Sequence, residues 1–101
     1  MDDAEAYEAL RERYWQLAGV EGVSLEAFVE DELSAGAGPG AIDRLRSLVE
    51  DVLDTALKNI AVKAEEEGGV YEEMADERIE EVGEERARLL ARLDRAAGEA
   101  R

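Results

Sequence analysis

The sequence predicts an all-α protein, a three- to four-helix bundle with one long central helix. Apolar residues recur at spacings of three and four along most of the chain, and glycine-rich segments separate the periodic stretches. No stretch alternates apolar and polar residues for long enough to predict a strand. With 101 residues, 46% of them apolar, the chain suits a single helical domain over 1–101. Short connections favour antiparallel neighbours.

Two shorter helices are predicted in the first third of the chain. The second covers residues 24–34, and Ser24 is expected to act as its N-cap. The first covers residues 3–18 and stops at Gly19. Its apolar stripe has spacings of three, four and three and consists of Tyr7, Leu10, Tyr14 and Leu17.

The long central helix is predicted over residues 40–67. The loop before it, residues 35–40, has the sequence Ala-Gly-Ala-Gly-Pro-Gly, which is unfavourable for a helix interior. Apolar residues form a wide stripe along the long helix, which indicates contacts on two sides. At 1.5 Å per residue this helix is about 40 Å long, longer than either preceding helix can cover. We therefore expect another helix to lie along it.

The last helix is predicted to end near residue 97, and its start is left open. Gly68 and the glycine that follows it interrupt the periodic pattern. A start at residue 70 lacks a capping side chain, whereas Asp76 would cap a helix that begins at residue 77. Both starts remain compatible with the sequence.

The composition excludes the common catalytic and metal-binding sites. The chain contains neither cysteine nor histidine, which removes thiolate and imidazole ligands, thiol nucleophiles and serine–histidine triads. Carboxylates are dense between residues 72 and 85, but their spacing is not that of an EF-hand, and we interpret them as a solvated acidic face. We therefore predict no enzyme, no catalytic residue, no cofactor and no metal.

The net charge of −15 disfavours nucleic acids and anionic membrane surfaces as partners. The N-terminal residues lack the basic and apolar regions of a signal peptide, and no stretch has the length of a membrane span, so a cytoplasmic location is expected. Abundant acids, alanine and glycine, with arginine favoured over lysine, fit a halophilic protein, a high-GC genome or a de novo designed bundle without a natural function. Composition leaves these three origins open.

A protein–protein interaction module is the predicted function, and a second copy of the chain is the predicted partner. Residues 72–85 carry eight acids and one base, whereas residues 86–101 carry five arginines and two acids. Two antiparallel copies of this segment would therefore set acid against base at both ends. The candidate interface residues lie mainly on the last helix and are Tyr71, Met74, Ile79, Val82, Arg86, Leu89, Leu90 and Leu93, together with Trp15 in the first helix.

One alternative function rests on the order and lengths of the elements. A short helix at 24–34, a loop, a long helix at 40–67 and a further helix are similar in length to the elements of the histone fold. That resemblance implies a DNA-associated regulator, and its contact with nucleic acid would have to come from the basic end at 86–101.

Overall fold

The computed structural model describes residues 2–99, apart from the side chains of residues 70–72, and shows four helices without a strand in that range. The predicted all-α class is confirmed. The two shorter helices are α1 (Asp3–Glu21) and α2 (Leu25–Ser34). Ser24 is the N-cap of α2, as expected, because its side-chain oxygen accepts a hydrogen bond of 3.1 Å from a backbone N–H in the first turn.

The prediction that Gly19 ends the first helix is wrong. The helix continues through Gly19 and ends at Gly22, whose φ of 67° is left-handed. The backbone N–H of Gly22 donates a hydrogen bond to the carbonyl oxygen of Leu17. Termination of this kind requires a residue with positive φ, and glycine adopts it without strain, whereas a glycine with helical φ merely weakens a helix.

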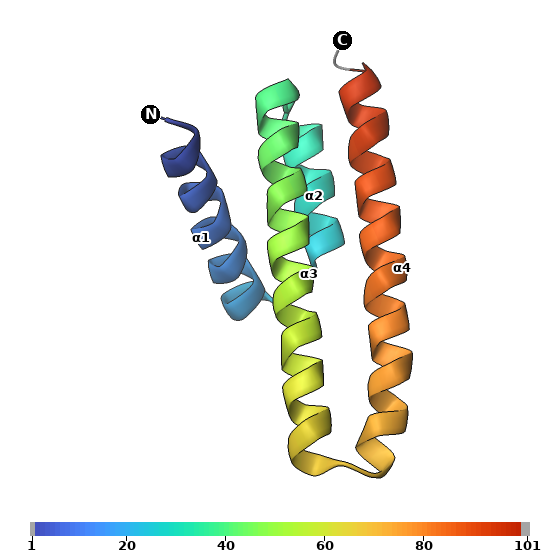
Figure 1. The fold of residues 1–101 in the computed structure, drawn as a ribbon. Helices are drawn as coiled ribbons and strands as arrows, with labels where there is room; N and C mark the ends of the chain where they lie inside the picture. Colours follow the sequence, from blue (N-terminus) through green and yellow to red (C-terminus); the bar gives the residue numbers. More distant parts are fainter. Residues whose placement is uncertain (1, 100–101) are drawn as a thin grey trace.

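The two long helices are α3 (Pro39–Glu67) and α4 (Val70–Glu99), which form an antiparallel hairpin (Figure 1). Of the two candidate starts for the last helix, the structure has the earlier one. The hairpin turn consists of Gly68 and Gly69, with φ values of 54° and 59°, and a tight turn with two positive φ angles favours glycine at both positions. Pro39 occupies the start of α3, where its missing N–H has no helical partner to lose.

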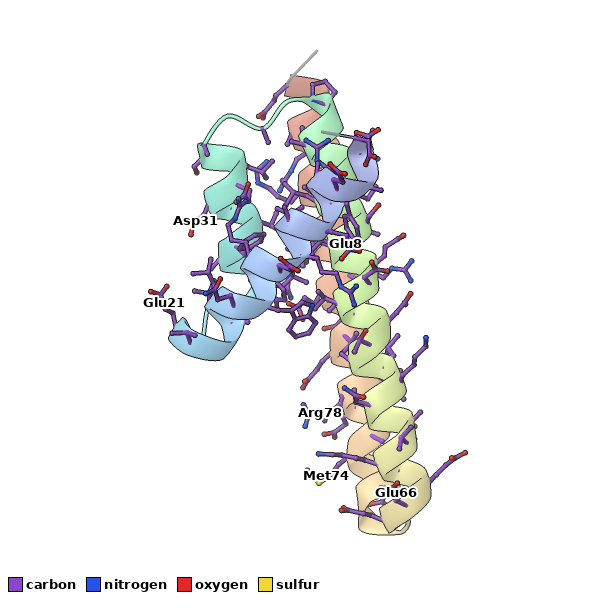
Figure 2. The ribbon with its side chains drawn as sticks, turned by 90° about the vertical axis from the view of Figure 1, so that its left-hand side faces the viewer. Glu8, Glu21, Asp31, Glu66, Met74 and Arg78 are labelled. Atoms are coloured by element: carbon purple, nitrogen blue, oxygen red, sulfur yellow. The ribbon has the colours of Figure 1, made fainter. Side chains whose placement is uncertain are left out.

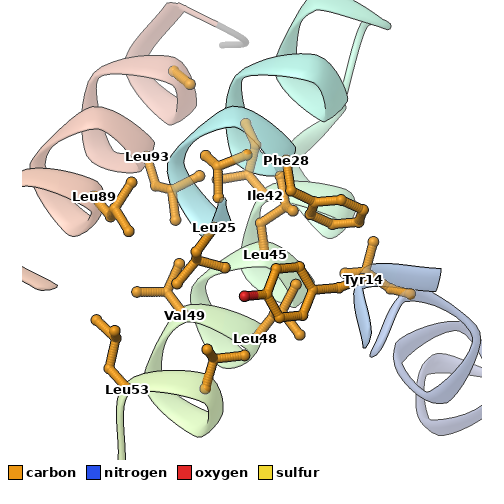
Figure 3. Close-up of a cluster of buried hydrophobic side chains, with 14 residues drawn as sticks. Tyr14, Leu25, Phe28, Ile42, Leu45, Leu48, Val49, Leu53, Leu89 and Leu93 are labelled. Atoms are coloured by element: carbon orange, nitrogen blue, oxygen red, sulfur yellow. The ribbon is translucent and has the colours of Figure 1, made fainter. Parts of the chain in front are cut away.

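The hydrophobic core occupies only the part of the hairpin that α1 and α2 cover. The helix α3 packs against the other three, and α2 also packs against α4. Figure 3 shows the cluster in which the four helices meet. Its buried members are Leu10, Tyr14, Leu25, Phe28, Val29, Ile42, Leu45, Leu48, Val49, Val52, Leu53, Leu89, Leu93 and Ala96.

Beyond this core the hairpin projects as a two-helix arm (Figures 1 and 2). We call residues 54–67 of α3 and 70–85 of α4 the arm, and the rest of the molecule the four-helix half. The projection gives the molecule its elongated dimensions of 48 × 25 × 24 Å. The predicted long central helix is confirmed, and its length exceeds that of α1 and α2, which produces the arm.

Candidate interaction surface

The arm buries few side chains of its own. Within its described part only Ile60 and Ala75 are buried, although the apolar stripes of both helices continue along it. Two large apolar side chains of α4 remain open to solvent, Met74 with 54% of its surface exposed and Ile79 with 42%. A two-helix segment leaves such stripes open because each helix has only one neighbour.

One face of the arm continues the face that α1 and α2 cover in the four-helix half. In Figure 2 the labelled side chains of Met74 and Arg78 point to the side of the hairpin on which α1 and α2 lie. A groove of about 240 Å³ runs between the two arm helices, and its lining residues are Ala56, Asn59, Ile60, Lys63, Arg78 and Val82. We call this groove together with Met74 the open face.

Trp15 lies near the point where the arm leaves the four-helix half. Its indole ring is 5.2 Å from the ring of Tyr14, edge-on, and Tyr14 is itself 5.4 Å from the ring of Phe28 in the core. Burial raises the pKa of Tyr14, and the negative charge of Glu85, the last residue of the arm, raises it further. Tyr14 is therefore a core residue, while Trp15, with 45% of its surface exposed, sits at the margin.

The charges of the arm are strongly unbalanced. Residues 54–85 carry twelve acids and three bases. Two of these bases, Lys63 and Arg78, line the groove, and neither forms an ion pair with another residue whose side chain the structure describes. The open face is thus an apolar and cationic strip within an acidic segment.

The arginines of the C-terminal half of α4 are in a different situation. Arg86 binds Glu50 of α3 at 3.0 Å, and Arg92 binds Glu30 of α2 at 2.8 Å. The predicted pairing of two antiparallel chains depends on the five arginines of residues 86–101. Two of these arginines already form ion pairs within their own chain. The same pairs lower the positive potential available for nucleic acid at this end, so the DNA-associated alternative gains no support.

The predicted interface residues whose side chains the structure describes are exposed, partly buried or in the core. Met74, Ile79 and Trp15 are exposed, and Arg86 is an exposed side chain held by Glu50. Val82 and Leu90 are partly buried against the core, and the side chain of Tyr71 lies outside the described residues. Leu89 and Leu93 belong to the core and cannot contact another chain without unfolding.

Sequence reasoning missed the contribution of α3 to this surface. It treated the whole stripe of the long helix as core, whereas Ala56 and Ile60 line the groove and Lys63 is exposed beside them. The lengths of the predicted helices could have indicated this, because the first two helices are too short to cover a hairpin of this size. The candidate surface is therefore made by two helices instead of one.

The described residues contain no group of three or more potential metal ligands of the histidine, cysteine, aspartate or glutamate type. No helix among them combines the length and apolarity needed to cross a membrane. Comparison of the chain with family models, curated proteins and solved structures gives no match.

Proposed function

We propose that this chain is a protein–protein interaction module that self-associates through its arm, with α4 as the main contact helix. The observation that carries the proposal is the uncovered half of the hairpin. Its apolar stripes continue past the ends of α1 and α2 and leave Met74 exposed beside the groove. Exposed apolar strips with a polar border are typical of protein contact sites.

Trp15 adds a second contact element at the base of the arm. Large, partly exposed aromatic side chains are enriched among residues that dominate binding energy, and the edge-on contact of Trp15 with Tyr14 already restrains its indole ring before binding. A partner seated on the open face would end close to this tryptophan.

Static light scattering over a range of protein concentrations tests the proposal. We expect a dimer at high micromolar concentration, favoured by added salt, because each copy carries a net charge of −15 that salt screens. A monomer at high micromolar concentration in both moderate and high salt would overturn it.

A pair of substitutions locates the contact. Met74→Glu places a charge on the open face and should weaken dimerisation by roughly tenfold or more, since loss of an anchor residue typically costs about 2 kcal/mol or more. Val20→Glu is the matched control, because Val20 lies outside the arm and is 80% exposed. Equal weakening by both substitutions would assign the effect to net charge alone and contradict the assignment of the surface.

A further inference from the structure

We infer that α1 is a hinged helix that opens from the other three helices in a step of its own, and that this opening lengthens the open face into the four-helix half. The inference concerns a single chain and is independent of the proposed self-association. It rests on the small buried contact of α1, on the clefts beside that contact and on the position of Gly22.

The apolar contact of α1 is narrow. Of its 19 residues only Leu10 and Tyr14 are buried, whereas α2 buries three side chains with 10 residues. Within the described residues α1 packs against α2 and α3 but not against α4. Segments with few buried apolar contacts open at a lower free energy than the core, because their opening exposes little apolar surface. Opening of α1 therefore costs less apolar burial per residue than opening of α2.

Two clefts lie on either side of this contact. One, of about 360 Å³, lies between α1 and α3 and is lined on α1 by Asp3, Ala4 and Tyr7. The other, of about 230 Å³, lies between α1 and the pair α2 and α3, and Ala6 and Ala9 line it on α1. Alanine side chains are too short to fill such spaces, and dense packing is what gives a protein interior its rigidity. The attachment of α1 lacks this packing along both of its edges.

The polar contacts of α1 with its neighbours lie at the surface. They include Asp3 with Arg44 at 3.4 Å, Arg13 with Glu32, and the Tyr7 hydroxyl with Asp51. Exposed ion pairs contribute little to stability, because both charges stay hydrated when the pair separates. These contacts therefore orient α1 without strengthening its attachment much.

Gly22 provides the hinge. It ends α1 with a left-handed φ of 67°, and residues 22–24 join α1 to α2. Glycine has the fewest restrictions on its backbone angles, so a rotation at this residue meets little resistance. The N-cap of α2 does not depend on α1, because the side chain of Ser24 accepts its hydrogen bond from the backbone N–H of Ala27. Thus α1 can swing away while α2 keeps its start.

The opening uncovers apolar side chains that adjoin the open face. The ring of Tyr14 lies 5.4 Å from the ring of Phe28, and Leu10 lines the same cleft as Leu45. Both Phe28 and Leu45 belong to the core cluster shown in Figure 3. Since the arm continues the face that α1 covers, departure of α1 joins these side chains to the open face in one longer apolar strip. The hinge therefore controls how much of the hairpin is available for contact.

Hydrogen exchange of the wild-type chain, followed by mass spectrometry at low protein concentration and low salt, tests the separate opening. The amides to compare are those of residues 10–16, in the middle of α1, and of residues 45–53 of α3, so that fraying of helix ends does not contribute. We expect protection factors at least about tenfold smaller in α1 than in α3. Equal protection of the two segments overturns the inference.

Two matched truncations sharpen this test. Leu93→Ala weakens the core, so protection in α3 should fall by about 30-fold or more while that in α1 stays unchanged, because the core remains folded when α1 opens. Leu10→Ala should lower protection in α1 as well. Where Leu93→Ala leaves too little folded protein, Leu93→Val gives the same comparison with a smaller fall. A parallel fall of protection in α1 and α3 on substitution of Leu93 overturns the separate opening.

Thiol labelling tests whether the opening lengthens the apolar face, because the chain contains no cysteine of its own. Leu45 and Leu93 are both fully buried, and Leu45→Cys and Leu93→Cys place one thiol at each position. Each labelling rate is divided by the equilibrium constant for global unfolding of the same variant. We expect the resulting value to be at least about tenfold larger for Leu45→Cys, since its thiol reacts whenever α1 is open. Equal values overturn the lengthening of the open face.

Discussion

The two halves of the hairpin have similar sequence patterns and different surroundings. In the four-helix half, α1 and α2 cover one face of the hairpin, and ion pairs such as Arg92 with Glu30 tie helices together. In the arm the same stripes face solvent on that side, with only Ile60 and Ala75 buried in its described part. Conformational stability is therefore concentrated in one half, and capacity for new contacts in the other.

The largest expected contrast comes from truncating one apolar side chain in each half. Leu93 is fully buried in the core, and Leu93→Ala should lower the free energy of unfolding by roughly 2–5 kcal/mol through lost contacts and a residual cavity. Met74→Ala should change it by less than about 0.5 kcal/mol, because this side chain is exposed. Urea denaturation at low protein concentration and low salt, where the chain is expected to be monomeric, measures both values.

Equal destabilisation by the two substitutions would contradict the difference between the two halves, since it would show that the arm contributes to the stability of the monomer as much as the core does. The same measurement at high protein concentration and high salt tests the stability of the dimer. Met74→Ala should then become destabilising, because the dimer is stabilised by contacts that the variant lacks.

Alanine substitutions at two glycines, Gly83 and Gly22, are expected to change the stability in opposite directions and by smaller amounts. An added Cβ at Gly83, inside α4 of the arm, meets no atom within 4 Å, so Gly83→Ala should stabilise the helix by about 0.5–1 kcal/mol. Gly22 also has free space, but its φ of 67° strains any L side chain, so Gly22→Ala should destabilise by about 1 kcal/mol. Thermal unfolding of both variants checks the signs. Destabilisation by Gly83→Ala would reveal a close approach at this position.

The helices could be predicted from the sequence because their causes are local. Ser24 before an apolar-periodic stretch predicts a helix start, and the alternating glycines between residues 35 and 40 predict a loop. Gly19 misled the prediction because glycine alone does not show its φ, and Gly22 three residues later carries the left-handed conformation. The start of α4 depends on how the two long helices pair, which capping patterns do not report.

The candidate surface could be predicted only in part, because burial is a tertiary property. The apolar stripe of α4 looks continuous in the sequence, and yet Leu93 ends in the core while Met74 remains outside. The division depends on where α1 and α2 end along the hairpin. Likewise, Arg86 is a candidate interface residue in the sequence, and its partner Glu50 could not be predicted because it lies 36 positions away on another helix.

The smallest predicted effect concerns the attachment of α1 to α3 in the four-helix half. The hydroxyl of Tyr7 donates a hydrogen bond to a carboxylate oxygen of Asp51, and burial, together with this bond and the charge of Asp51, raises the pKa of Tyr7 above its ordinary value of 10.0. Above that pH the tyrosine loses its proton in the unfolded chain while the folded chain retains it. The free energy of unfolding should therefore fall as the pH rises from about 9 to about 11. Tyr7→Phe should make this fall shallower, and Asp51→Asn should do so partly, because an amide still accepts the hydrogen bond without the charge. Urea denaturation across this pH range gives the slopes, and identical slopes in all three proteins would show that Tyr7 is not held by α3 in solution.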